Sequence, residues 1–289
     1  MPFGIFAAIG LGIVFDSVPY IREMLPFMIA SLLFFNFLKL EIKIRNFIRK
    51  EVLLIGIFTW IVFPALVYFL SKPLDDAFRI GIFVIAITPT AIGSPIVASL
   101  IDADSEMSAS QVVFSNALSP LVYSFLLYLY FNNADIQVPV FAIFKKLVLI
   151  IIVPIAFSAI AAKSKVISGS LARVSKFYVP LTFIIAVFGA VSASSASIKQ
   201  IGLQELAVKM LIVFALAAFL FTFGFLLPGE KSIKKSYALA FGHKNTVLAI
   251  WIVLFNFQKE SIVPLILYII FHHICNGIMV FLNTAKKPS

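Results

Sequence analysis

The chain has 289 residues, of which 62% are hydrophobic and 12% are charged, and its mean hydropathy is +1.08. A soluble domain of this length could not bury so much apolar surface, so lipid must solvate most of the chain. The net charge of +10 does not indicate nucleic acid as a partner, because the basic residues fall into short loops between apolar runs. A single cysteine, Cys275, excludes an intrachain disulfide.

Apolar segments recur along the whole chain, and most approach the ~20 residues needed to cross ~30 Å of hydrocarbon. There are ten, at residues 2–16, 24–40, 52–70, 78–100, 107–131, 147–162, 177–196, 205–227, 237–257 and 261–284. Because a lipid-facing backbone must satisfy its own hydrogen bonds, each is predicted to be helical. The sequence therefore predicts an all-α polytopic membrane protein with ten transmembrane helices, of which the fourth and ninth are interrupted. The first segment lacks preceding basic residues and a cleavage site, so we interpret it as a short span and not a signal peptide.

Lysine and arginine residues are distributed unevenly between alternate loops. With the N-terminus inside, the cytoplasmic loops hold fourteen of them and the opposite loops hold eight. This bias predicts a protein of the cell inner (plasma) membrane with both termini in the cytoplasm. Residues 138–146, which include Lys145 and Lys146, are predicted to form an amphipathic segment at the outer interface before the sixth span.

The fourth and fifth spans resemble the ninth and tenth in their organisation. Each pair has an interrupted apolar run, a short link with acidic residues at 102–106 or 258–261, and a long helix. We interpret residues 1–289 as one transmembrane transporter domain, with inverted repeats at about 1–132 and 138–285. Paired interruptions at matching positions are typical of a transporter site at the bilayer midplane.

The interruption of the fourth span combines residues that break helices with residues that supply oxygen atoms. Pro89 and Pro95 cannot donate a backbone hydrogen bond, and Gly93 relaxes the backbone. Thr90 and Ser94 add hydroxyl groups. Unwinding here would expose carbonyls that coordinate cations and a half-helix N-terminus that attracts anions. The alternative is a proline kink whose hydroxyls bond back to their own helix.

The interruption of the ninth span contains a lysine at hydrocarbon depth, Lys244, which costs roughly 2.5–3.5 kcal/mol on insertion scales. It is flanked by Gly242, which tolerates a broken helix, and by His243, Asn245 and Thr246. The lysine could neutralise an anionic substrate, replace a bound cation, or carry a proton if burial favours its neutral form. Snorkelling to an interface is the alternative, and it is disfavoured because both ends of the span are distant in sequence.

The three histidines, His243, His272 and His273, could indicate a metal site, but no cysteine pair or buried carboxylate accompanies them. Two adjacent histidines on a helix also point in different directions. A polar packing role is therefore favoured, and no metal is predicted. Asn116 and Asn276 fall inside spans and could hydrogen-bond the interrupted segments.

Catalysis is not predicted. The acidic residues fall near the ends of spans, whereas an intramembrane aspartyl protease needs a mid-span acid. Ser94 and Lys244 could form a hydrolytic dyad, but no nucleophile elbow is present.

The chain resembles the bile acid:sodium symporter family and its superfamily of bile acid, arsenite and auxin-like carriers. The likeness covers nearly the whole chain and is clearest at Ala77–Pro120, Ala240–Ala249 and His272–Asn276. It implies ten helices in two inverted five-helix repeats. Helices 3–5 and 8–10 would form a core domain in which helices four and nine cross at unwound centres. Helices 1, 2, 6 and 7 would form a panel domain, with substrate in the crevice between the two.

The resemblance also implies positions equivalent to the sodium ligands of the family, and these are Thr59, Ser94, Ser108, Ala240 and Lys244. A Ser-Asn pair of sodium-coupled members reads Ser94-Pro95 here, and a threonine one turn after the serine at 108 is replaced by Val112. A glutamate that helps to form both sodium sites of the family corresponds to Ala240 here. Two glutamines of the family correspond to Lys244 and Thr59. Asn245, adjacent to substrate in family members, is retained.

Charge arithmetic then predicts the mechanism. Two sodium ions and one glutamate leave one net positive charge at the crossing, and one lysine without the glutamate leaves the same. We therefore expect a secondary carrier of a small or amphipathic organic anion, independent of sodium or weakly dependent on it, with no cofactor and with H⁺ favoured over Na⁺ as coupling ion. The alternatives are a passive channel or sensor and a conventional sodium-coupled symporter. The predicted substrate-binding residues are Thr90, Ser94, Lys244, Asn245, Thr246 and His272.

Overall fold

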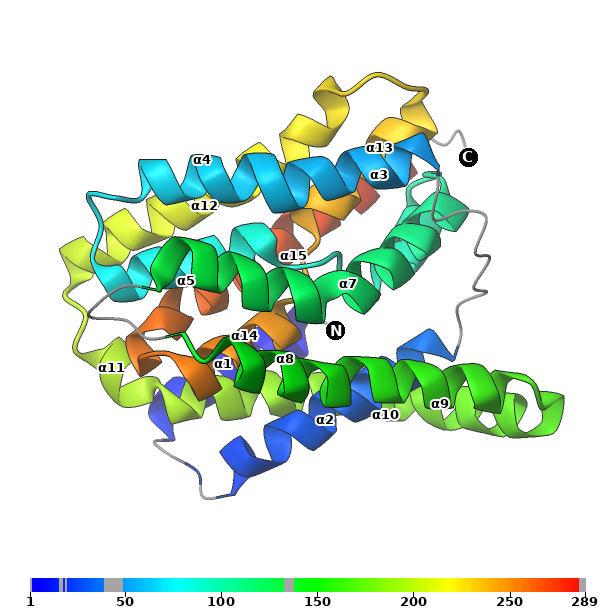
Figure 1. The fold of residues 1–289 in the computed structure, drawn as a ribbon, viewed down its shortest axis with the longest axis horizontal. Coiled ribbons are helices and arrows are strands. Elements are labelled where there is room, and N and C mark those ends of the chain that lie inside the picture. Colours follow the sequence, from blue (N-terminus) through cyan, green and yellow to red (C-terminus); the bar gives the residue numbers. More distant parts are fainter. Residues whose placement is uncertain (1, 16–17, 19, 39–48, 133–137, 286–289) are drawn as a thin grey trace.

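A computed structural model of the chain describes residues 2–15, 18, 20–38, 49–132 and 138–285 (Figure 1). Within these ranges the regular structure is helical, and no β-strand occurs. Some basic residues that contribute to the predicted charge bias lie outside the described residues, namely Lys39, Lys43, Arg45, Lys286 and Lys287.

The first half of the chain contains two separate helices, a third span with a π-helical turn at its centre, and an interrupted fourth span that leads into a long helix. The elements are α1 (Pro2–Val14), α2 (Ile21–Phe37), α3 (Lys50–Ile57), η2 (Phe58–Val62), α4 (Phe63–Leu70), α5 (Asp76–Ile87), α6 (Ser94–Leu100) and α7 (Ser105–Phe131).

The second half has the same kinds of elements. They are α8 (Val140–Leu147), η3 (Val148–Ile152), α9 (Val153–Ala162), α10 (Lys165–Ala193), α11 (Ser195–Lys199), α12 (Leu203–Leu226), α13 (Lys231–Gly242), α14 (Thr246–Asn256), η4 (Lys259–Ile262) and α15 (Val263–Thr284).

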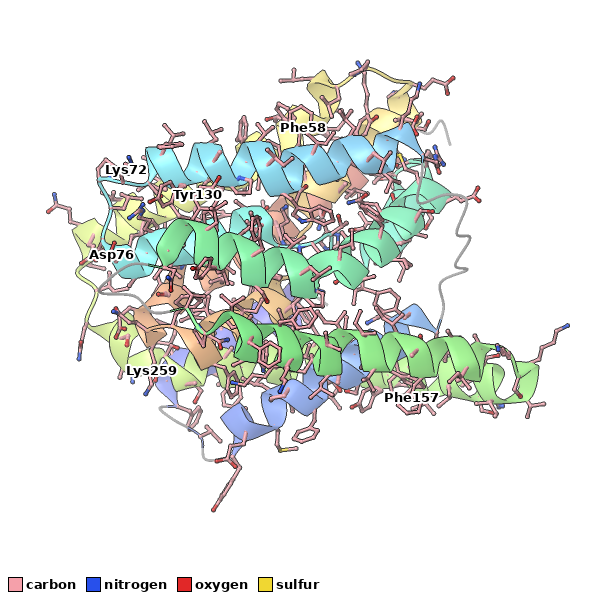
Figure 2. All side chains as sticks on the ribbon, viewed as in Figure 1. Phe58, Lys72, Asp76, Tyr130, Phe157 and Lys259 are labelled. Atoms are coloured by element: carbon pink, nitrogen blue, oxygen red, sulfur yellow. The ribbon has the colours of Figure 1, made fainter. Side chains whose placement is uncertain are left out.

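Six helices of the described chain are long and apolar enough to cross a membrane, and the shorter helices α1, α2 and α14 are also apolar. The six cover Lys50–Leu70, Ser105–Phe131, Val140–Ala162, Lys165–Ala193, Leu203–Leu226 and Lys259–Thr284. Large apolar side chains also cover the outside of the molecule, as Figure 2 shows for Phe157 on α9, which is 60% exposed. These features are those of a multi-pass membrane protein.

The predicted interfacial segment at 138–146 is wrong, because α8, η3 and α9 form one continuous helix from Val140 to Ala162. The amphipathic pattern has a different cause. Ile143 and Leu147 are fully buried, and α8 packs against α7, while Lys145 lies over the Phe141 ring at 4.4 Å. Packing against a neighbouring helix produces the same periodicity as an interface.

The seventh span begins earlier than the predicted boundary of 177, because α10 starts at Lys165. The side chain of Ser164 caps this helix by accepting a hydrogen bond from the Ile167 N–H at 3.4 Å. Arg173 and Lys176 fall between the predicted sixth and seventh spans, but in the structure they lie on the first half of a helix. The predicted span begins at 177 because hydropathy marks only the apolar part of a helix. It does not detect helical residues before that part when they are charged.

The helices form two outer groups with a third set between them. In Figure 1, α1, α2, α9 and α10 lie together along the lower edge, and α3, α4, α12 and α13 lie along the upper edge. Helices α5, α7, α14 and α15 lie between them. Lys72, Asp76 and Lys259 gather at one end of the molecule (Figure 2), so the connections at that end are charged.

Aromatic packing and a glycine contact fix the position of α13, which leads into the second interruption. The ring of Phe241 packs edge-on against Phe63 at 5.2 Å and against Phe223 at 5.6 Å. On α12, Gly224 lies directly against the backbone of Ala238, where a Cβ atom would overlap it. The close approach of α12 and α13 therefore requires a glycine at this position.

Gly224→Ala is expected to lower the stability of the protein by about 1–3 kcal/mol, because the added methyl group must push two packed helices apart. Gly10→Ala is the matched control, since a Cβ at Gly10 meets nothing within 4 Å. Thermal unfolding of the two variants in the same detergent measures the difference. Equal unfolding temperatures would show that the two helices do not approach this closely.

Candidate functional site

The two interruptions cross and pair with each other. An isolated antiparallel bridge joins Thr90 to Lys244. The Ala91 N–H donates to the carbonyl of His243 at 2.7 Å, and the Asn245 N–H donates to the carbonyl of Pro89 at 2.9 Å. The unwound residues therefore satisfy one another's backbone groups in a region that offers no water to do so.

Local sequence explains why both helices stop and restart here. Pro89 cannot donate to the preceding turn, and Pro95 stands in the first turn of α6, where its missing N–H is not needed. Gly93 is the residue just before α6. In the second interruption, Asn245 caps α14 by accepting a hydrogen bond from the Leu248 N–H at 3.4 Å, and Gly242 is the last residue of α13.

The ammonium of Lys244 is buried at the C-terminal end of α5. Its Nζ donates to the carbonyl of Ala86 at 3.2 Å and to that of Thr88 at 3.0 Å, and the residue is 1% exposed. The snorkelling alternative would need the ammonium at a water surface, and the structure places it inside the protein instead. A helix C-terminus carries partial negative charge, so a cation there is favourable.

Thr88 completes the last turn of α5. Its hydroxyl lies 2.5 Å from the Val84 carbonyl and 2.7 Å from the Tyr123 hydroxyl, and its N–H donates to Ile85. Three successive carbonyls of α5, from residues 84, 85 and 86, thus have a donor. Lys244 supplies the only charged donor among them.

Thr90 makes the reciprocal contact. Its hydroxyl donates to the carbonyl of Ala240 at 3.0 Å, near the C-terminal end of α13. Each partner in the Thr90–Lys244 bridge therefore reaches the carbonyl of the residue four positions before the other partner, Ala240 in one case and Ala86 in the other. The two half-helix C-termini are capped in the same manner, one by a hydroxyl and one by an ammonium.

Asn116 on α7 ties both interruptions together. Its Nδ2 donates to the carbonyls of Thr90 at 3.0 Å and Val112 at 2.8 Å, and its Oδ1 accepts from Asn245 Nδ2 at 2.9 Å. The amide orientation follows from this network. From α15, the Tyr268 hydroxyl donates to the carbonyl of Gly242 at 2.7 Å. Sequence reasoning singled out Asn116 but missed Tyr268, whose only signal is a phenol at mid-span.

The predicted substrate-binding residues lie at or next to this crossing. Thr90, Ser94, Lys244, Asn245 and Thr246 belong to the interruptions or the first residues of α6 and α14, and all are buried. His272 lies on α15, and its ring centroid is 5.2 Å from that of His243, whose Nδ1 is 3.1 Å from Ser94 Oγ.

The positions predicted to be equivalent to the family's sodium ligands include two unpartnered hydroxyls, an alanine and the buried lysine. Thr59 Oγ1 and Ser108 Oγ are buried without a hydrogen-bond partner, which a cation could use. However, Ala240 supplies no carboxylate, and the Lys244 ammonium already occupies the carbonyls of α5. Across the described residues, no group of three His, Cys, Asp or Glu side chains is arranged to hold a metal ion.

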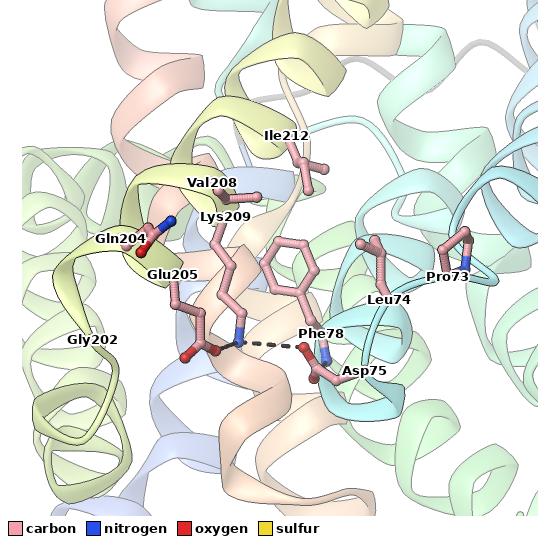
Figure 3. A pocket seen from close by; sticks show the side chains of 10 residues that line it. All are labelled: Pro73, Leu74, Asp75, Phe78, Gly202, Gln204, Glu205, Val208, Lys209 and Ile212. Carbon is pink, nitrogen blue, oxygen red and sulfur yellow. Dashed lines mark hydrogen bonds and ion pairs between the residues drawn. The ribbon is translucent and has the colours of Figure 1, made fainter.

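A separate cavity of about 530 Å³ lies between the start of α5 and the start of α12 (Figure 3). Lys209 points into it and pairs with Glu205 at 2.6 Å and with Asp75 at 3.4 Å. Asp75 also caps α5 by accepting from the Phe78 N–H at 2.8 Å. No predicted site residue lines this cavity, and its one lysine is already paired with two carboxylates, so the crossing is the better candidate site.

Interrupted helices that cross at a buried polar centre in an apolar helical protein define the class of multi-pass membrane transporters. The profile of the Sodium Bile acid symporter family matches residues 24–204, more than half of the chain, and the chain belongs to this family. The match includes the first interruption and ends before the second. A search of curated proteins finds no significant match. The family resemblance expected from sequence is confirmed, and its members are transporters and not enzymes.

Asn116→Ala is expected to destabilise the protein by about 2–4 kcal/mol, because it leaves the Thr90 carbonyl and the Asn245 amide buried without a partner. Asn256→Ala is the matched control, since Asn256 is partly exposed and bonds only the Ile252 carbonyl one turn earlier, at 2.8 Å. Thermal unfolding of both variants gives the comparison. A loss of stability in the control as large as that at Asn116 would contradict the tethering role.

Proposed function

We propose that this protein is a secondary carrier that moves a small or amphipathic organic anion across the membrane by alternating access, without a bound sodium ion. Family membership indicates a transporter of the bile acid or organic anion type. The observation that carries the finer proposal is the buried ammonium of Lys244 on the carbonyls of Ala86 and Thr88.

The proposed topology has ten spans in two inverted repeats, at about residues 1–132 and 138–285, with both termini in the cytoplasm of an inner (plasma) membrane. The reciprocal contacts of Thr90 and Lys244 support it, because each interruption caps the other in the way that two related repeats would. In this proposal a core of spans 3–5 and 8–10 rocks against a panel of spans 1, 2, 6 and 7. The crossing then faces each side of the membrane in turn.

Electrostatics supports the loss of sodium binding. A sodium ion held within ~4 Å of the Lys244 ammonium would be repelled by about 4 kcal/mol at an effective dielectric constant of about 20. No carboxylate at Ala240 offsets this repulsion. The unpartnered hydroxyls of Thr59 and Ser108 are the observation that favours the alternative, a conventional sodium-coupled symporter.

The same charge suits an anionic cargo. The ammonium of Lys244 makes the crossing electropositive, and the N-terminal end of α14 begins one residue beyond Asn245. The side chains proposed to contact the cargo are those of Thr90, Ser94, Lys244, Asn245, Thr246 and His272. A proton remains the proposed coupling ion.

Reconstituted protein is expected to exchange labelled cholate or pantoate across proteoliposomes in a saturable manner, at the same rate in sodium chloride and in choline chloride. These two probes represent an amphipathic and a small carboxylate. A channel would instead give conductance without saturable exchange. The proposal fails if neither probe exchanges, or if exchange requires sodium.

Lys244→Gln is expected to lower this uptake at least about tenfold, since it removes the charge that caps α5 and attracts the anion. Lys259→Gln is the matched control, because Lys259 is exposed at the charged end of the molecule and should leave uptake intact. Initial rates are measured over a range of pH. Unchanged uptake in Lys244→Gln at every pH would refute the role of the lysine.

A further inference from the structure

The three histidines of the chain meet beside the crossing. The ring centroids of His243 and His272 are 5.2 Å apart, those of His272 and His273 are 4.3 Å apart, and those of His243 and His273 are 6.4 Å apart. His243 belongs to the second interruption, and the other two are consecutive residues of α15. The fold therefore joins them into one group, which we call the histidine cluster.

His272 is the unusual member of the cluster. Neither Nδ1 nor Nε2 has a hydrogen-bond partner among the described residues, and the residue is only 1% exposed. A neutral imidazole carries one donor and one acceptor, so two polar atoms are buried unsatisfied, each at a cost of about 1–3 kcal/mol. One helical turn later, Asn276 Oδ1 is also buried without a partner. Such a group indicates a place where a ligand or proton binds.

No carboxylate faces the cluster from the described helices around it. Helices α1, α6, α14 and α15 contain no Asp, Glu, Lys or Arg. The charged residues of α5, α12 and η4, which also pack on α15, lie in the first two turns of those elements. They are Asp76, Arg79, Glu205, Lys209, Lys259 and Glu260. Most of them have a partner at that end: Arg79 pairs with Asp76, Lys209 with Glu205 and Asp75, and Glu260 with Ser197.

The other described neighbours are uncharged or already engaged. On α10, Phe183 contacts the His273 ring at 6.3 Å, and the basic residues of that helix come at least seven positions earlier. Tyr268 contacts the His272 ring at 5.5 Å, and Cys275 follows on the same helix. Lys244, next to His243 in sequence, directs its ammonium to α5.

We propose that His272 binds a proton together with the transported anion, so that this one histidine of the cluster is the proton-coupling site of the carrier. This inference rests on the proposed function, in which the cargo is an organic anion. A proton from solution adds to the free lone pair of the His272 ring, and no bond in the cargo forms or breaks. The imidazolium then faces the carboxylate of the cargo. On the other side of the membrane the anion dissociates, and the proton returns from the His272 ring to solution.

Burial makes the two binding events depend on each other. An imidazolium alone among these apolar helices would lack a counter-charge, and the positive charge of Lys244 would oppose it further. A carboxylate arriving with the proton supplies the counter-charge and a hydrogen-bond acceptor. By linkage, the anion strengthens proton binding and the proton strengthens anion binding by the same factor.

Lys244 is less suited to carry the proton. Its ammonium donates to the carbonyls of Ala86 and Thr88 at the end of α5, and a neutral amine would leave that helix end without its charged donor. His272 can gain or lose a proton without breaking a hydrogen bond, because neither of its nitrogens has a partner among the described residues. In this proposal, Lys244 keeps a fixed charge and His272 carries the titrating one.

Calorimetry of cholate binding, with pantoate in parallel, tests this in full-length protein in lipid nanodiscs. Titrations at one pH in two buffers of different ionisation enthalpy count the protons taken up. The wild type is expected to take up about one proton per anion, and His272→Gln close to none. His273→Gln is the comparison variant and should retain most of the uptake.

A second measurement needs no variant. The chain has three histidines, so ¹⁵N-histidine labelling reports on three imidazole rings, one of which should become protonated when cholate is added. Anion binding without proton uptake, or uptake that persists in His272→Gln, overturns the inference while saturable exchange in proteoliposomes still supports the carrier. Absence of both binding and exchange for cholate and pantoate overturns the carrier and this inference together.

Discussion

The hydrogen bonds from the Lys244 ammonium to the carbonyls of Ala86 and Thr88 are the interaction on which the centre of this protein depends. A helix that stops inside a membrane leaves carbonyls without donors, and no water is present to satisfy them. The lysine supplies both hydrogen bonds and a positive charge at the negative end of the α5 dipole. The cost of burying the charge is thereby offset by the groups that the interrupted helix exposes.

The rest of the crossing is arranged around this contact. The backbone bridge between Thr90 and Lys244 holds the two interruptions together, and Asn116 and Tyr268 fix their carbonyls from α7 and α15. The histidine cluster lies at one side of this network, and His272 is the member whose two ring nitrogens both lack a partner among the described residues. In the proposed carrier, the network supplies a rigid, permanently charged support, and the cargo and its proton use the groups that the network leaves free.

Sequence was a good guide where the signal is local. Hydropathy located the long apolar helices, prolines and glycines located the interruptions, and short motifs identified the family. Sequence failed where tertiary packing decides whether a segment is part of a long helix. The Lys145 region belongs to a long helix one face of which packs on α7, and α10 includes the charged residues that precede its apolar part. Which carbonyls Lys244 reaches, and that His272 lies beside His243, depend on contacts between residues distant in the chain. No periodicity encodes such contacts.

The most direct test of the central claim, a lysine in place of a bound cation, is the unfolding temperature of the purified protein in sodium chloride and in choline chloride at equal ionic strength. A bound ion stabilises the folded state in proportion to the logarithm of its concentration. The account predicts that the unfolding temperature is the same in both salts at every concentration. A temperature that rises with sodium, and not with choline, would contradict it.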